Sequence, residues 1–296
     1  MISKQVKGYA YGAVSAASYG VNPLFALLLY AGGQTVDSVL FYRYFFALLM
    51  LAVLMKVQGT GFAIHRHEVL PLAVMGLLFS SSSIFLFDSY NYMDAGIAST
   101  ILFVYPLMVA LLMALFFHER LTWLTLGSIS LAFVGISLLY KGGNGETLSL
   151  FGVGCVLMSS LTYALYIIGV NRSSLKEMPT ARLTFYALLF GSIILLVRLR
   201  FGLDLPAVAA PIHWIYILLL ALFPTIISLI TMTLSVHYIG STPTAILGAL
   251  EPVTALFFGV MVFNEQLTPR ILLGILLILA GVTVIIVADN EKNKRK

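Results

Sequence analysis

The chain has 296 residues, of which 60% are hydrophobic and only 10% are charged, against about 25% charged residues in a soluble domain. Its 17 Lys and Arg and 12 Asp and Glu residues cannot cover the surface of a soluble fold of this length, so water is excluded as its main solvent. The net charge is +5, and the basic residues lie in short gaps between apolar segments and in the C-terminal tail. This distribution suits anionic lipid headgroups and argues against nucleic acid as a partner.

Ten apolar segments follow one another along the chain, each close to the 20 or so helical residues that span a bilayer core of about 30 Å. They lack the period-two alternation of a membrane β-barrel, and the gaps between them are too short for a soluble domain. The sequence therefore predicts an all-α integral membrane protein with ten transmembrane helices. The expected spans are residues 7–30, 36–56, 68–91, 94–117, 122–140, 149–171, 180–199, 211–237, 241–263 and 268–288.

The distribution of Lys and Arg predicts the orientation of these helices. With the N-terminus in the cytoplasm, 11 of these residues fall inside and 4 outside, and two more lie within helix ends. Arg198 and Arg200 are a local exception on the outside. We therefore expect a multi-pass protein of a bacterial-type inner (plasma) membrane with both termini in the cytoplasm.

An internal repeat becomes visible when the chain is compared with itself at a shift of 146 residues. Five identities fall within seventeen positions, which apolar composition alone does not explain. We expect a first repeat over residues 1–140 and a second over 141–296. Because each would hold five helices, an odd number, the second is expected to be inverted relative to the first, with a substrate site between them. The matched pairs are Pro106 and Pro252, Phe117 and Phe263, Glu119 and Glu265, Leu121 and Leu267, Thr122 and Thr268, and, further on, Gly135 and Gly281.

These motifs resemble those of the drug/metabolite transporter superfamily, specifically the EamA-type ten-helix group. The resemblance covers nearly the whole chain and is strongest from Tyr105 to Leu121 and, in the second half, from Glu251 to Thr268. Weaker elements are the segment from Tyr19 to Pro23 and the position of Arg43 early in the second helix. The resemblance implies transport of small organic metabolites, often amino acids, or of drugs across the inner membrane without ATP.

Glu251 precedes Pro252 in the second half, whereas Tyr105 precedes the matched Pro106 in the first half. The two halves therefore differ by a charge at this position. Glu251 lies near the middle of the ninth segment, where an acidic residue costs about 3 kcal/mol and is a functional candidate by default. Pro252, like Pro106 in the first half, removes a backbone hydrogen bond and can kink its helix, which exposes a carbonyl group beside the carboxyl. Proton coupling or binding of a substrate ammonium would use this arrangement. The alternative is a protonated or hydrogen-bonded Glu251 that only holds helices together.

Arg43 and Asp88 are candidates for a second charged element near the outer side. Arg43 can extend to lipid headgroups, pair with Asp88, or bind a substrate carboxylate. Together with Glu251 for an amine, Arg43 would suit an amino acid.

Polar and aromatic residues on the first and sixth helices are candidates to line a cavity. Tyr19 and Asn22 share a face of the first helix, and Tyr163 and Tyr166 recur on the sixth. A buried phenol needs a partner, so these tyrosines either face a cavity or pack between helices.

Glu119 and Glu265 end the fourth and ninth segments, directly before the next helix. We expect each to cap the following helix, with Thr122 and Thr268 as N-cap residues. An inverted repeat places the two carboxylates on opposite faces of the membrane, so they are not expected to form one catalytic pair.

The sequence gives little support for an enzyme. The five histidines form no i, i+4 pair for zinc, Cys155 is the only cysteine, and Walker A and dinucleotide motifs are absent, so we expect no metal and no cofactor. The first hypothesis is a secondary transporter, in the export direction, of small metabolites such as amino acids. It would take a small-molecule substrate, a coupling proton or an exchanged solute, and membrane lipid as partners. The alternatives are a multidrug or amphiphile exporter on the same scaffold and a non-transporting membrane protein.

Overall fold

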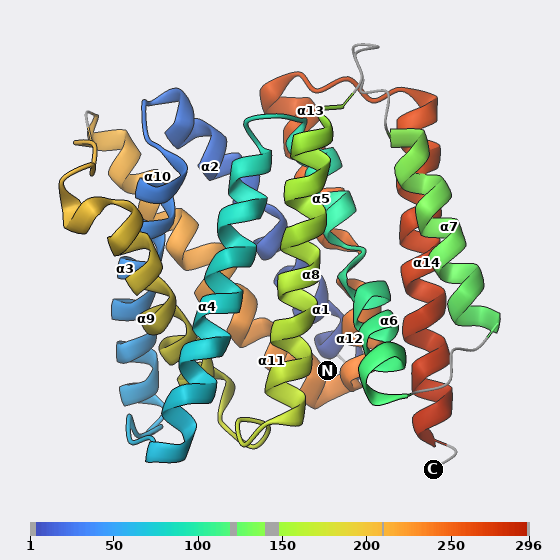
Figure 1. The fold of residues 1–296 in the computed structure, drawn as a ribbon, viewed down its shortest axis with the longest axis horizontal. Coiled ribbons are helices and arrows are strands. Elements are labelled where there is room, and N and C mark those ends of the chain that lie inside the picture. The colour runs from blue at the N-terminus through green and yellow to red at the C-terminus, as the bar shows by residue number, and fades with distance from the viewer. Residues whose placement is uncertain (1–3, 119–122, 140–147, 209, 295–296) are drawn as a thin grey trace.

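The computed structural model describes residues 4–118, 123–139, 148–208 and 210–294, and within these ranges every regular element is a helix (Figure 1). The elements of the first half are α1 (Lys4–Gly20), α2 (Asn22–Ala31), α3 (Val36–Val57), α4 (Arg66–Ser89), α5 (Ala95–Leu102), α6 (Tyr105–Phe117) and α7 (Trp123–Leu139). Those of the second half are α8 (Leu150–Arg172), α9 (Thr180–Arg198), the 3₁₀-helix η1 (Arg200–Gly202), α10 (Pro211–Ala221), the π-helix η2 (Leu222–Ile227), α11 (Ser228–Ile239), α12 (Ser241–Leu247), α13 (Leu250–Phe263) and α14 (Pro269–Lys294).

These elements form ten spans, because α1 and α2, α5 and α6, α10 to α11, and α12 and α13 each continue one another. Eight of the spans in the described residues are long and apolar enough to cross a membrane, and Trp123–Leu139 and Pro269–Val284 are shorter apolar helices. The predicted all-α membrane fold with ten helices is confirmed. The boundaries agree to within a few residues, except that α14 extends to Lys294, beyond the expected end at residue 288. In Figure 1, α1 begins in the lower half and α14 ends at the lower edge, so both ends of the chain lie on the same side.

Prolines explain two of the helix breaks. A proline lacks the N–H that would bond the carbonyl oxygen four residues earlier, so that oxygen needs another donor within a membrane. Pro23 leaves the Tyr19 oxygen free, and Asn22 Nδ2 donates to it at 2.9 Å. Pro106 does the same to the Leu102 oxygen, which accepts from Ser160 Oγ at 3.1 Å. Both carbonyl oxygens that lose a donor at the breaks are therefore hydrogen-bonded, one by a nearby residue and the other by a neighbouring helix.

The two halves match in backbone conformation as well as in sequence. The break before Pro106 falls at residues 103–104 and that before Pro252 at 248–249, close to equivalent positions of the repeat. His118 (φ 53°, ψ 29°) and Asn264 (φ 55°, ψ 31°) are 146 residues apart, and both end their helices in the left-handed conformation. The division between residues 140 and 141 stays a prediction, and these equivalences support it.

Crossed contacts between α7 and α14 have the form that a two-fold axis produces. A Cβ atom added to Gly135 would lie 2.7 Å from the Gly274 oxygen, and one added to Gly281 would lie 2.8 Å from the Ser128 oxygen. Gly135 and Gly281 are equivalent in the repeat, as are Ser128 and Gly274. The pairing also runs in opposite directions along the two helices, so α7 and α14 are antiparallel and approach closely through small residues.

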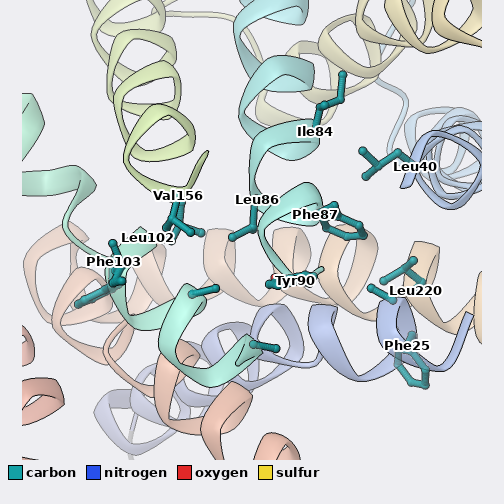
Figure 2. Close-up of a cluster of buried hydrophobic side chains, with 14 of the residues drawn as sticks. Phe25, Leu40, Ile84, Leu86, Phe87, Tyr90, Leu102, Phe103, Val156 and Leu220 are labelled. Atoms are coloured by element: carbon teal, nitrogen blue, oxygen red, sulfur yellow. The ribbon is translucent and has the colours of Figure 1, made fainter. Parts of the chain in front are cut away.

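The core joins helices from both halves around the middle of the molecule. Figure 2 shows buried side chains from α2, α3, α4, α5, α8 and α10 converging there, among them Phe87, Leu102 and Val156. Ser82 on α4 and Ser159 on α8 each donate to the other's backbone oxygen, at 3.0 and 2.7 Å. Such reciprocal bonds hold two membrane helices together without an unsatisfied polar group.

Candidate functional site

Glu251 lies in the first turn of α13, immediately after the helix break at residues 248–249. Its backbone N–H donates to the Gly248 oxygen at 2.9 Å. The N-terminus of a helix carries a partial positive charge, so this position favours a carboxylate. Tyr105 occupies the first turn of α6 in the same way. The two residues therefore stand at equivalent helix starts, and only Glu251 can carry a charge there.

The side chain of Glu251 interacts with four phenols, three of them on α1, α6 and α8 and the fourth on the residue that follows α4. Electrostatic interactions connect it to Tyr19, Tyr90, Tyr105 and Tyr163. Glu251 and three of these tyrosines nevertheless keep some accessible surface, whereas Tyr90 is only 6% exposed. We call Tyr19, Arg43, Tyr105, Tyr163 and Glu251 the central group.

Arg43 on α3 is the cationic member of this group. It is 4% exposed, its guanidinium carbon lies 5.6 Å from the centre of the Phe87 ring, and it lies beside the phenol of Tyr19. Its Nε has no hydrogen-bond partner among the described residues. A buried guanidinium with a free donor is costly unless an anion or water meets it. Arg43 is therefore not a headgroup anchor, because its side chain is enclosed by protein.

An aromatic wall extends the central group toward α4 and α8. The rings of Tyr105 and Tyr163 meet edge to face with centroids 4.9 Å apart, Tyr163 stacks on Tyr166 at 6.0 Å, and Tyr166 meets Phe79 at 5.4 Å. The wall combines large apolar faces with phenol groups that can donate or accept. Pro106 is partly accessible at its edge, whereas Pro252 and Asn22 are buried.

The structure brings together most of the predicted site residues but places Asp88 elsewhere. Asp88 interacts electrostatically with Arg198 and Asp37 rather than with Arg43. The suggested pair of Arg43 and Asp88 is therefore replaced by two separate charged groups. Asp88 is the next residue after Phe87, and on a helix consecutive side chains point in different directions.

Glu265 caps a helix, but not the one that the sequence suggested. Its carboxylate accepts the backbone N–H groups of Ala95 (2.7 Å) and Gly96 (3.2 Å) at the start of α5, in the other half of the chain. Thr268 caps α14 as predicted, because its hydroxyl accepts the N–H of Ile271 at 3.3 Å. Glu119 and Thr122 lie outside the described residues.

Glu265 gives the stability of the protein a pH dependence. Burial, and then the charge of Asp94, raise its pKa from 4.5 to about 7, against the two backbone hydrogen bonds, which lower it. A folded-state pKa above the unfolded one means that the stabilisation is complete below pH 4.5 and is lost as the pH rises through 7. We expect the melting temperature of the wild type to fall relative to that of Glu265→Gln between pH 5 and pH 8.

The matched control is Glu68→Gln, which removes a partly exposed carboxyl that caps α4 by accepting the His65 N–H at 2.6 Å. Thermal melts in detergent at both pH values measure the difference. A gap between wild type and Glu265→Gln that does not change with pH would contradict this assignment.

Gly20 allows the first span to touch the backbone of α13. A Cβ atom at this position would lie 2.5 Å from the Glu251 oxygen and 2.7 Å from Thr254 Cβ, and neither atom moves cheaply. We expect Gly20→Ala to cost about 1–3 kcal/mol of stability by overpacking. Gly154→Ala is the control, because nothing lies within 4 Å of its added Cβ. Equal melting temperatures of the two variants would argue against this close contact.

Sequence reasoning missed Phe87 and Tyr90, which face the central group from α4. Phe79, Ser83, Phe87 and Tyr90 follow a helical spacing that places them on one side of α4. That periodicity was the available signal. Within the described residues, no group of three or more His, Cys, Asp and Glu side chains is arranged to hold a metal ion.

The profile of the EamA-like transporter family matches this chain over residues 6–141 and 150–287. The chain belongs to the EamA-like transporter family. An uncharacterized transporter of Archaeoglobus fulgidus is 30% identical over 255 residues, which cover 86% of this chain and 87% of that protein. The uncharacterized transporter YoaV of Bacillus subtilis is 24% identical over 286 residues, which cover 93% and 91% of the two chains.

The fold of this EamA-like transporter also occurs in a solved crystal structure. The two superpose with a TM-score of 0.66 at 16% sequence identity, over 95% of this chain and 96% of the other. The family and its relatives identify this protein as a multi-pass membrane transporter.

Proposed function

We propose that this EamA-like transporter is a secondary exporter of small organic metabolites, with α-amino acids as its substrate class. It works by alternating access between two inverted repeats, residues 1–140 and 141–296, in an inner membrane with both termini in the cytoplasm. A coupling proton or an exchanged solute supplies the driving force, since transport uses no cofactor. Lipid surrounds the helices, and nucleic acid plays no part.

The proposal rests on the position of two oppositely charged side chains, Arg43 and Glu251, beside the same phenol. Tyr19 lies beside Arg43 and also interacts with Glu251, so the same phenol adjoins a buried guanidinium, whose Nε has no partner among the described residues, and the carboxyl of a partly accessible residue. An α-amino acid presents a carboxylate and an ammonium group on one carbon atom. The carboxylate would meet Arg43, whose planar guanidinium suits carboxylates, and the ammonium would meet Glu251.

The aromatic wall favours a second candidate, an exporter of cationic amphiphiles. Tyr105, Tyr163, Tyr166 and Phe79 offer ring faces that bind apolar and cationic groups without a carboxylate. In this alternative Glu251 alone holds the charge of the ligand, and Arg43 has no ligand role.

Growth of overexpressing cells on toxic amino-acid analogues and on cationic dyes separates the two. We expect tolerance to the analogues, lost in Glu251→Gln at equal expression, and no tolerance to dyes. Tolerance to dyes alone would replace the amino-acid proposal with the amphiphile alternative. Sensitivity to both classes would overturn transport of either.

A further inference from the structure

A cavity lies away from the central group, at the side of the molecule opposite to the end of α14. It is formed where α2 ends, α3 begins, and α4 and α9 end, along the upper side of Figure 1. Its volume of about 390 Å³ falls within the range of roughly 300–1,000 Å³ found for small-molecule sites. The residues that line this outer cavity are Tyr30, Gln34, Thr35, Val36, Asp37, Asp88, Asn91 and Arg198.

The outer cavity carries one more negative than positive charge. Arg198 Nε donates to Asp37 Oδ1 at 2.7 Å, which joins α9 to α3. Asp88, half-buried, adds a second carboxylate that interacts with both members of this pair. A cavity with two carboxylates and one guanidinium attracts a ligand with a positive group.

Several of the lining groups already form hydrogen bonds within the protein. The polar atoms that remain are those that can contact a ligand. Tyr30 donates to the Phe87 oxygen at 3.1 Å. Gln34 donates to the Ala207 oxygen at 3.1 Å and accepts from Ser38 at 3.0 Å. Within the described residues no hydrogen bond to the Asp88 carboxylate is found, so both of its oxygens are acceptors for a ligand.

A layer of aromatic residues separates the outer cavity from the central group. Phe87, 1% exposed, and Tyr90, 6% exposed, contact each other with ring centroids 5.5 Å apart at the end of α4 (Figure 2). Phe87 meets Arg43 on one side, while its neighbour Asp88 faces the outer cavity. Arg43 and Asp88 therefore belong to two distinct sites.

We propose that the outer cavity is a second binding site, which recognises the primary ammonium group of a small organic amine through Asp88. The inference rests on the proposed function, because an amine-bearing solute is the one that Glu251 would also take. Ammonium has three N–H donors, and Asp88, the second oxygen of Asp37 and the Asn91 carbonyl offer acceptors around one space. The remaining guanidinium nitrogens of Arg198 disfavour a second cation in the same cavity.

The test uses the purified full chain in detergent and two probes, L-alanine methyl ester, which has the ammonium but no carboxylate, and propionate, which has only the carboxylate. We expect the ester to raise the melting temperature of the wild type and propionate not to. In a Glu251→Gln background, in which the central group lacks its carboxylate, Asp88→Asn raises the ester concentration needed for the shift about tenfold or more, because a charge-assisted hydrogen bond is lost. Asp88→Glu, which keeps the charge, retains the shift.

Two further variants separate this site from the central group. Glu251→Gln alone is expected to keep the part of the ester-induced shift that is due to the outer cavity. Asp204→Asn, which removes an exposed acid that pairs with Arg200 at 3.2 Å, is expected to keep the whole shift. No shift in the wild type, loss of the whole shift in Glu251→Gln, or a shift in that background that Asp88→Asn leaves unchanged would each overturn the proposal. Amino-acid export by the central group is measured separately by the growth assay, so failure of the outer site and failure of the proposed function give different results.

Discussion

Glu251→Gln is expected to reduce transport of amino acids into proteoliposomes by more than about tenfold, and to remove any dependence of the remaining flux on the pH gradient. Glutamine has the same shape but cannot ionise, so it can neither hold an ammonium group by charge nor carry a proton. The surrounding phenols of Tyr19, Tyr105 and Tyr163 still have an amide to contact. The variant should therefore fold and insert normally.

Glu177→Gln is the matched control, because Glu177 is exposed in the connection between α8 and α9. It should transport as the wild type does. Flux by Glu251→Gln equal to that of the control, with an unchanged pH dependence, would remove Glu251 from the mechanism. The carboxyl would then be a group that only holds helices together.

Arg43→Lys is expected to raise the half-saturating concentration of an amino acid about tenfold while leaving that of the matching decarboxylated amine unchanged. Lysine keeps the charge but lacks the planar guanidinium, which binds a carboxylate through two parallel hydrogen bonds. The loss should thus follow the carboxylate of the substrate. Competition assays with the amino acid and its amine in the same proteoliposomes measure both values.

Arg200→Lys serves as the control for this substitution, since Arg200 is exposed and pairs only with Asp204 among the described residues. Equal losses for the amino acid and the amine in Arg43→Lys would mean that Arg43 supports the fold rather than the substrate carboxylate. The cation–π contact with Phe87 and the contact with Tyr19 would then account for its burial.

Local sequence features predicted the transmembrane spans and one helix cap, but not the contacts that depend on tertiary packing. The ten spans follow from apolar length alone, and Thr268 could be assigned because an N-cap bonds residues three positions away. Glu265 shows the limit: a carboxylate at a helix end was expected to act locally, but tertiary packing brings the start of α5 to it, 170 residues away in sequence. Nothing in the local sequence encodes that distance.

The sequence indicated which residues belong to the central group, but not which of them contact one another. Glu251 stood out because a mid-membrane carboxylate is costly, and the tyrosines because buried phenols need partners. Whether Arg43 meets Asp88 or Tyr19 depends on a rotation of α4, on which Phe87 and Asp88 are adjacent but point differently. Such a rotation is set by packing against α8 and α9, which a single sequence does not reveal.

The central claim is that water and solute reach the central group from both sides of the membrane in turn. It is tested most directly by Tyr105→Cys in a Cys155→Ser background, which leaves one cysteine at the equivalent of Glu251 in the repeat. We expect a membrane-impermeant thiol reagent to label it both in right-side-out and in inverted vesicles, and bound substrate to slow the labelling. Labelling by a lipid-soluble reagent alone, or from one side only, would contradict the account.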